Sequence, residues 1–234
     1  MKNINIKDIF IISLCFIIFT VIGTLTHELG HIFTAEFLGY ETKLHYGSMS
    51  FKNLNNDGLF DIYHKNEYAI KNNLPFHKKA EYFERIQKYS LERFLITIGG
   101  PIQTILTGTI GFLLLYYRRI KNIVFNKFDW LFVFFALFWL RQVFNPTFSI
   151  IRRLLRGTGK WIGRSDETKI SEFLNLSRGF FDFLLGSIGL LICSYVMFVI
   201  IPKNHRLTFI ISGIFGGVFG FYFWMYKIGP IVLP

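Results

Sequence analysis

The chain has 234 residues, of which 52% are hydrophobic, 18% are charged and 29 are phenylalanine. This composition leaves too little polar surface for a soluble globular protein, and it excludes collagen-like, disordered and disulfide-rich secreted chains. We therefore predict an integral membrane protein. In such a protein, basic residues that flank the spans explain the net charge of +11 before nucleic-acid binding has to be considered.

Five apolar segments are long enough to cross a bilayer core of roughly 30 Å. The clearest covers residues 94–115 without any charge, whereas the third is shorter and contains Arg141. The predicted fold class is an all-α polytopic membrane protein that forms one domain over residues 1–234. Its spans are expected at about 9–38, 94–117, 128–144, 180–201 and 207–228.

The segment between the first two spans, residues 41–90, is the main part expected outside the membrane. Residues 42–54 alternate between apolar and polar side chains as a strand does. Residues 55–58 are typical of a turn, and residues 59–63 are expected to return as the second strand of a small β-hairpin. Over residues 76–94, apolar residues recur at near-helical spacing between basic ones, which predicts an amphipathic helix on the membrane surface.

The distribution of Lys and Arg predicts the orientation of the spans. Five spans place the two chain ends on opposite sides, so that eight Lys and Arg residues fall on the N-terminal side and 17 on the other. Cytoplasmic loops are enriched in Lys and Arg, so we expect the N-terminus outside and the other side in the cytoplasm. The same asymmetry accounts for most of the net charge without any nucleic acid.

The end of the first span carries His27-Glu28-Leu29-Gly30-His31, which matches the pattern H-E-x-x-H. Residues four apart on a helix lie about 40° apart around its axis, so both imidazoles can reach one zinc ion. Glu28 is rotated about 100° from His27 and can take a proton from a water on that metal. We predict one zinc ion per chain, with His27 and His31 as ligands and Glu28 as the catalytic base.

A third ligand is expected from another segment, because catalytic zinc usually has three protein ligands and one open position. We favour Asp166, which lies in the loop 145–178 on the same side of the membrane as the motif. Its neighbour Glu167 is an alternative. Asp182 is another, although Arg178 precedes it by four residues and offers it an ion pair instead.

With these features, the sequence resembles the site-2 protease family of intramembrane zinc metalloproteases. The resemblance rests first on the motif at residues 26–31, followed by Leu38-Gly39. It rests second on Gly99-Gly100-Pro101-Ile102-Gln103-Thr104, which is similar to the family's Gly-Pro-x-x-Asn element with Thr104 where Asn is usual. The third feature is an acidic residue after the third span.

The family usually supplies its last ligand from an Asn-Pro…Asp-Gly stretch. Here Asn145-Pro146 is present without a nearby Asp-Gly, and Asp166 follows 20 residues later between Ser165 and Glu167. The resemblance implies that Asp166 is the third ligand and that the substrate is a transmembrane helix, which must unwind locally before water can attack it.

The resemblance also implies roles in substrate binding. The hairpin region at residues 42–63 is expected to bind the unwound segment by strand addition. Asn145, Gln103 or Thr104 is expected to orient the substrate or to hydrogen-bond the oxyanion, with packing between helices as the alternative for each.

The predicted function is that of a zinc-dependent intramembrane endopeptidase. Two alternatives stay open: a membrane-surface zinc peptidase acting on peptides or soluble tails, and a non-catalytic scaffold or transporter that retains a metal site. Glu28 argues against the second alternative, because a scaffold needs no general base.

The expected partners are the lipid bilayer and a membrane protein or peptide substrate, with no nucleic acid and with the oligomeric state open. We expect a multi-pass protein of the bacterial cell (inner) membrane, with its active site toward the cytoplasm.

Overall fold

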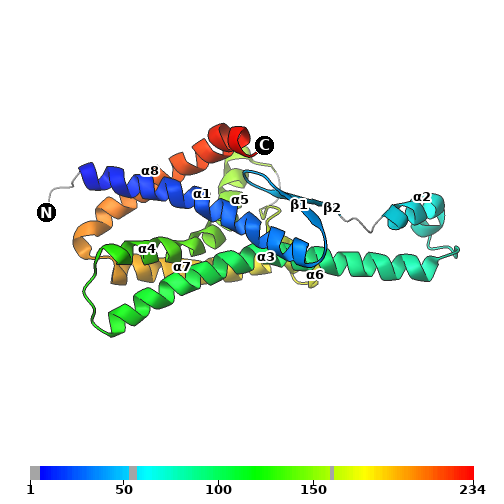
Figure 1. Ribbon diagram of the computed structural model, residues 1–234, viewed down its shortest axis with the longest axis horizontal. Helices are drawn as coiled ribbons and strands as arrows, with labels where there is room; N and C mark the ends of the chain where they lie inside the picture. The colour runs from blue at the N-terminus through cyan, green and yellow to red at the C-terminus, as the bar shows by residue number, and fades with distance from the viewer. Residues whose placement is uncertain (1–5, 53–56, 159–160) are drawn as a thin grey trace.

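The computed structural model describes residues 6–52, 57–158 and 161–234, and it is mostly helical (Figure 1). The elements in chain order are α1 (Ile6–Phe37), β1 (Glu41–Leu44), β2 (Met49–Lys52), α2 (Asp57–Lys71), α3 (Lys79–Ile120), α4 (Lys127–Ala136), η1 (Leu137–Trp139), α5 (Leu140–Arg156), α6 (Asp166–Phe173), α7 (Phe180–Tyr195), η2 (Val196–Ile200), α8 (Lys203–Phe223), η3 (Trp224–Ile228) and α9 (Gly229–Val232).

Five helical stretches among the described residues are long and apolar enough to cross a membrane, by length and composition. Their number agrees with the prediction from the sequence. They cover Ile6–Phe37, Lys79–Ile120, Lys127–Arg156, Phe180–Ile200 and Lys203–Val232. Large apolar side chains point away from the bundle, as Phe10 and Leu191 do with 71% of each residue exposed. Such a surface fits lipid tails better than water.

The five candidate spans pack as pairs of neighbours. α1 lies between α8 and α3, α3 also packs against α4, and α5 packs against α7 (Figure 1). The start of α1 and the C-terminal residues lie toward opposite ends of this bundle. An odd number of spans requires that arrangement.

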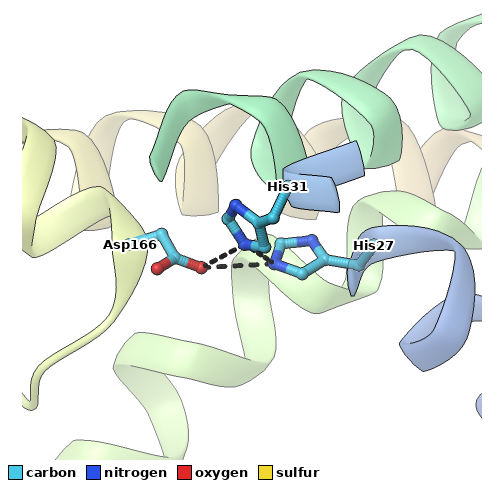
Figure 2. Close-up of side chains that lie close together, drawn as sticks. All are labelled: His27, His31 and Asp166. Atoms are coloured by element: carbon cyan, nitrogen blue, oxygen red, sulfur yellow. Dashed lines mark hydrogen bonds and ion pairs between the residues drawn. The ribbon is translucent and has the colours of Figure 1, made fainter. Parts of the chain in front are cut away.

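Small residues let α1 and α3 touch at one level of the bundle. A Cβ atom added to Gly30 would come within 2.5 Å of the Gly99 carbonyl oxygen and within 2.8 Å of the Gln103 Cβ. Glycine at both positions therefore allows backbone-to-backbone contact, as small residues do between membrane helices. This contact lies beside His27 and His31, whose side chains are drawn in Figure 2.

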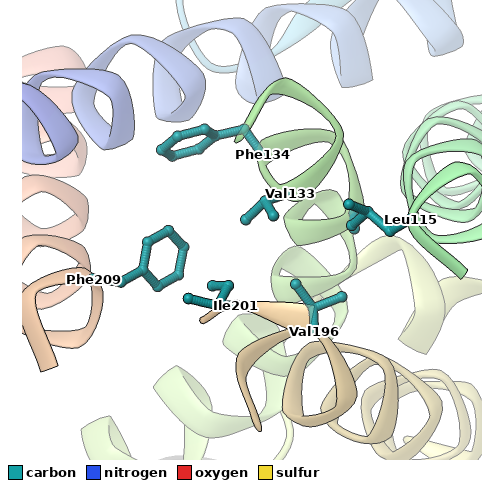
Figure 3. Packing of buried hydrophobic residues seen from close by; sticks show 7 residues of the cluster. Leu115, Val133, Phe134, Val196, Ile201 and Phe209 are labelled. Carbon is teal, nitrogen blue, oxygen red and sulfur yellow. The ribbon is translucent and has the colours of Figure 1, made fainter. Parts of the chain in front are cut away.

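An apolar cluster closes the other end of the bundle. Side chains from α3, α4, η2 and α8 meet there and exclude solvent almost completely (Figure 3). Its buried members are Leu115, Val133, Phe134, Ala136, Val196, Ile201 and Phe209. At the same end, Arg118 of α3 forms an ion pair with the buried Asp129 of α4. Gly100 and Leu115 are 15 residues apart in α3, so this cluster lies about 22 Å along the helix from the level of His31.

The predicted β-hairpin is present, with bounds that differ from the expected ones. β1 and β2 pair antiparallel, so that Glu41 lies opposite Lys52 and Leu44 lies opposite Met49. The hairpin therefore closes over residues 45–48, earlier than expected. His45 N–H closes this turn by donating to the Ser48 carbonyl oxygen at 2.9 Å.

The second strand expected at residues 59–63 is wrong, because these residues belong to α2. Leu59 and Ile62, three residues apart, are both buried against Tyr82 of α3. A helix brings residues at this spacing onto one face, whereas a strand would turn them to opposite faces. In the expected turn at residues 55–58, positions 55 and 56 lie outside the described residues.

The separate surface helix expected at residues 76–94 is also corrected by the structure. α3 runs from Lys79 to Ile120 as one helix that includes the second span. Its first part projects beyond the other candidate spans and carries α2 at its far end (Figure 1). No Gly or Pro occurs between residues 79 and 98. The sequence therefore contains no helix-breaking residue between the basic segment and the candidate span, and the helix continues through both.

Candidate metal centre

Side chains from α1 and α6 converge at one point inside the bundle (Figure 2). The Nε2 atoms of His27 and His31 lie 3.2 Å apart. The Oδ2 atom of Asp166 lies 3.2 Å from the first and 3.3 Å from the second. Both histidines are buried, with 1% and 7% of the residue exposed. The three residues therefore form a group that could hold a metal ion.

The spacing of these three atoms fits tetrahedral coordination. Zinc–nitrogen and zinc–oxygen bonds of about 2.0–2.1 Å at tetrahedral angles place the ligand atoms about 3.3 Å from one another. The three distances of 3.2, 3.2 and 3.3 Å match that value. Two imidazole lone pairs and a carboxylate repel each other at such distances, so a proton or a metal ion has to lie between them.

The backbone of α3 orients His31. Its Nδ1 atom lies 2.7 Å from the carbonyl oxygen of Ile96. A carbonyl oxygen can only accept, so we assign the proton of the neutral ring to Nδ1 and leave Nε2 with its lone pair toward Asp166.

Thr104 of α3 orients His27 in the same way. The Thr104 hydroxyl donates to the Gly100 carbonyl oxygen at 3.0 Å, so at 2.8 Å it accepts from His27 Nδ1. The Nε2 atom of His27 thus also carries a lone pair. Hydrogen bonds of this kind at the second ring nitrogen are typical of metal-ligating histidines.

Gly100 leaves the space that the two histidines occupy. A Cβ atom at this position would lie 2.6 Å from His27 Nε2 and closer still to His31 Nε2. Any side chain at position 100 would therefore push the two nitrogen atoms out of place. This gives a physical reason for a glycine at this position of the Gly-Gly-Pro sequence.

Asp166 is the first residue of α6, and its carboxylate has a separate partner for each oxygen. Oδ1 accepts from the Lys169 ammonium group at 2.9 Å, which leaves Oδ2 for the two histidines. Burial alone would raise the pKa of the Asp166 carboxyl, but a proton carried on Nε2 of His27 or His31, in the place that a metal ion would take, hydrogen-bonds Oδ2 and holds the pKa well below its usual range. The carboxyl is thus ionised at neutral pH, as a metal ligand must be.

Glu167, the neighbouring alternative, points to a different helix. Its Oε2 atom accepts from the Asn145 side-chain amide of α5 at 3.2 Å. Glu167 is 1% exposed, and burial raises the pKa of its carboxyl. Asn145, expected to contact substrate, therefore ties α5 to the residue next to Asp166. Glu167 is not part of the group that His27, His31 and Asp166 form.

Asp182, the other alternative, lies in the first turn of α7 and accepts from two hydroxyl groups of the α6 region. The ion pair expected between Asp182 and Arg178 is wrong. The Arg178 guanidinium instead pairs with Glu172 at 2.9 Å and donates to the Gly163 carbonyl oxygen at 3.1 Å. The Glu172 carboxylate and the Gly163 carbonyl oxygen are thus the partners of Arg178, in place of the Asp182 carboxylate that the four-residue spacing predicted.

The two remaining candidates lie on α3. The Gln103 amide donates to the Thr107 hydroxyl one turn later, at 3.1 Å. Thr104 is 1% exposed, and its one hydroxyl hydrogen is directed at Gly100. The geometry therefore favours Thr104 as the partner of His27 over a donor to an oxyanion.

The roles of Ser165 and Thr168 were not predicted from the sequence. The Ser165 hydroxyl accepts from the Thr168 N–H at 3.0 Å and so caps α6 at the residue before Asp166. A serine directly before an acidic first turn is typical of a helix N-cap, so the sequence carried a signal for this helix start. No such signal existed for the partner of these hydroxyls on α7.

Comparisons with protein-family models, with curated proteins and with solved structures find no match for this chain. Its function is therefore inferred from the chemistry of its own residues.

Proposed function

We propose that this protein is a zinc-dependent intramembrane endopeptidase, with one zinc ion per chain held by His27, His31 and Asp166. The observation that carries the proposal is the triangle of two Nε2 atoms and one Oδ2 atom with sides of 3.2–3.3 Å. Both rings present lone pairs to it, because their Nδ1 protons are used elsewhere. Two imidazoles and one carboxylate at tetrahedral spacing are a donor set that suits zinc and leaves one position open.

A zinc ion held there would supply a Lewis acid and a water of lowered pKa. The chain itself supplies the base. Glu28 adjoins His27 in α1, is 7% exposed, and forms no hydrogen bond or ion pair with any described residue. A buried carboxylate without a structural partner is costly to keep. Taking a proton from the attacking water, and passing it to the leaving amine, gives Glu28 a function that explains its position.

The surroundings support a substrate that arrives from the bilayer. The site lies between α1 and α3, which are both candidate membrane spans. Apolar side chains border the motif on the outside of α1, where Phe33 is 74% and Leu29 is 47% exposed. A transmembrane segment can reach such a surface directly, whereas a soluble peptide would have to leave water. We therefore propose cleavage of a peptide bond in or near a transmembrane segment.

The proposed orientation follows from charge. The side that carries 17 Lys and Arg residues, together with the metal centre, faces the cytoplasm, and the N-terminus faces outward. The proposed location is the bacterial cell (inner) membrane.

The test compares purified wild type with Glu28→Gln. We expect about one zinc ion per chain in both proteins by mass spectrometry of the metal, because Glu28 is a base and not a ligand. Membrane proteomes of cells that express each form should differ, with intact substrate accumulating only in Glu28→Gln. Wild type without zinc, or a zinc-loaded wild type whose membrane proteome matches that of Glu28→Gln, would refute the proposal.

A further inference from the structure

A buried carboxylate on α7 contacts the helix that carries Asp166. Asp182 is 2% exposed, and its Oδ1 atom accepts from the Ser165 hydroxyl at 2.6 Å. Its Oδ2 atom accepts from the Thr168 hydroxyl at 2.9 Å. One side chain of the fourth span thus holds both hydroxyl groups of the first turn of α6.

These contacts bracket Asp166 in the sequence. Ser165 directly precedes it and also caps α6 by accepting from the Thr168 N–H at 3.0 Å. Thr168 follows it by two residues and is 1% exposed. The position and rotation of the α6 start are therefore tied to α7. Neighbouring residues on a helix point about 100° apart, so a small rotation there would turn Asp166 away from the histidines.

We infer that Asp182 is a positioning residue of the metal centre, which holds the first turn of α6 so that Asp166 meets His27 and His31. The inference rests on the proposed metal site. Asp182 acts through Ser165 and Thr168 and does not itself join the converging ligand atoms.

The chemistry of Asp182 favours this role over plain packing. A buried carboxylate costs free energy unless hydrogen bonds or a cation compensate it. Among the described residues no cationic side chain pairs with Asp182, and Arg178 is engaged by Glu172. The two hydroxyl groups are therefore the compensating partners. Each oxygen of the carboxylate has one of them, so the loss of either hydroxyl leaves a buried oxygen without its donor.

The experiment uses the full-length protein in detergent or lipid and two variants of one residue. Thr168→Val keeps the shape of the side chain and removes the hydroxyl, whereas Thr168→Ser keeps the hydroxyl and removes a methyl group. Zinc affinity is measured by competition with a chelator, and the site geometry by the visible spectrum of the cobalt(II)-loaded protein. We expect Thr168→Val to bind zinc about 10- to 100-fold more weakly with an altered cobalt spectrum. Thr168→Ser should resemble wild type in both.

A matched control separates positioning from general loss of stability. Asp129 is also a 2% exposed carboxylate in the first turn of a helix, but it lies at the other end of the bundle beside Arg118. Asp129→Asn should lower the melting temperature of the protein while leaving zinc affinity and the cobalt spectrum unchanged. Asp182→Asn, which keeps one acceptor oxygen, should weaken zinc binding and alter the spectrum.

These measurements distinguish a failure of the positioning role from a failure of the proposed function. If Thr168→Val and Asp182→Asn keep wild-type zinc affinity and spectrum, the positioning role is refuted while the metal site stands. The role is also refuted if Asp129→Asn weakens zinc binding as much as they do. A wild type that binds zinc but cleaves nothing refutes the protease proposal alone, and a wild type that binds no metal refutes both.

Discussion

His31 donates its Nδ1 proton to the carbonyl oxygen of Ile96, 2.7 Å away, so the backbone of α3 holds a side chain of α1. The acceptor is not a side chain and cannot be removed by substitution at position 96. What maintains this bond is the close approach of α1 and α3 through Gly30 and Gly99. The geometry of the candidate metal centre therefore depends on how closely these two helices pack as well as on His27, His31 and Asp166.

The first prediction concerns Gly100. Gly100→Ala should weaken zinc binding by at least about 100-fold, because its Cβ would displace the Nε2 atoms of both histidines. Gly217→Ala is the matched control, since a Cβ there meets nothing within 4 Å. Metal analysis of both purified variants checks this. Normal zinc content in Gly100→Ala would show that the histidines do not share one ion.

The second prediction separates two adjacent acids. Asp166→Ala should lose zinc and activity together, because two histidines alone hold zinc poorly. Glu167→Gln should keep zinc, because its side chain bonds Asn145 and not the ligand atoms. Zinc content and protease activity of the two variants are measured side by side. Loss of zinc in Glu167→Gln with full zinc in Asp166→Ala would reverse the assignment.

The third prediction tests the hydroxyl that orients His27. Thr104→Val should weaken zinc binding about 10-fold, because His27 Nδ1 loses its acceptor and the ring is free to turn. Thr104→Ser should retain wild-type affinity. Thr97→Val on the same helix is the control, since within the part of the chain that the structure describes the Thr97 hydroxyl bonds only the Arg93 carbonyl of its own helix. Equal zinc affinities for Thr104→Val and Thr97→Val would argue against this orienting role.

The fourth prediction concerns orientation in the membrane. A cysteine introduced by Val124→Cys, between α3 and α4, should react with an impermeant thiol reagent added to intact cells. Val124 is 82% exposed and lies on the same side as the N-terminus, which we propose to face outward. A cysteine introduced by Thr158→Cys, after α5, should react only once the cells are opened. Wild type gives the background from Cys15 and Cys193. The opposite labelling pattern would invert the proposed topology.

Local sequence was sufficient for the features that depend on one helix. The five candidate spans follow from runs of apolar residues, because a bilayer core requires about 20 of them in a row. The approach of His27 to His31 follows from their spacing, because a helix places residues four apart on one face. The hairpin was predicted but its turn was misplaced, since the short strands at Glu41–Leu44 and Met49–Lys52 leave little periodicity to read.

Only the tertiary structure could choose among Asp166, Glu167 and Asp182. All three acidic residues follow the third candidate span, Asp166 and Glu167 before the fourth and Asp182 at its start, and nothing in their order says which one turns toward the histidines. The choice depends on how α6 docks, and this is set by contacts between residues that are 14 to 17 positions apart, Ser165 and Thr168 with Asp182. The same is true of Gly100 and Thr104, whose contacts with His27 cross from one span to the next. Periodicity reports which face of a helix is apolar, but it carries no information on which residue of another helix will lie against that face.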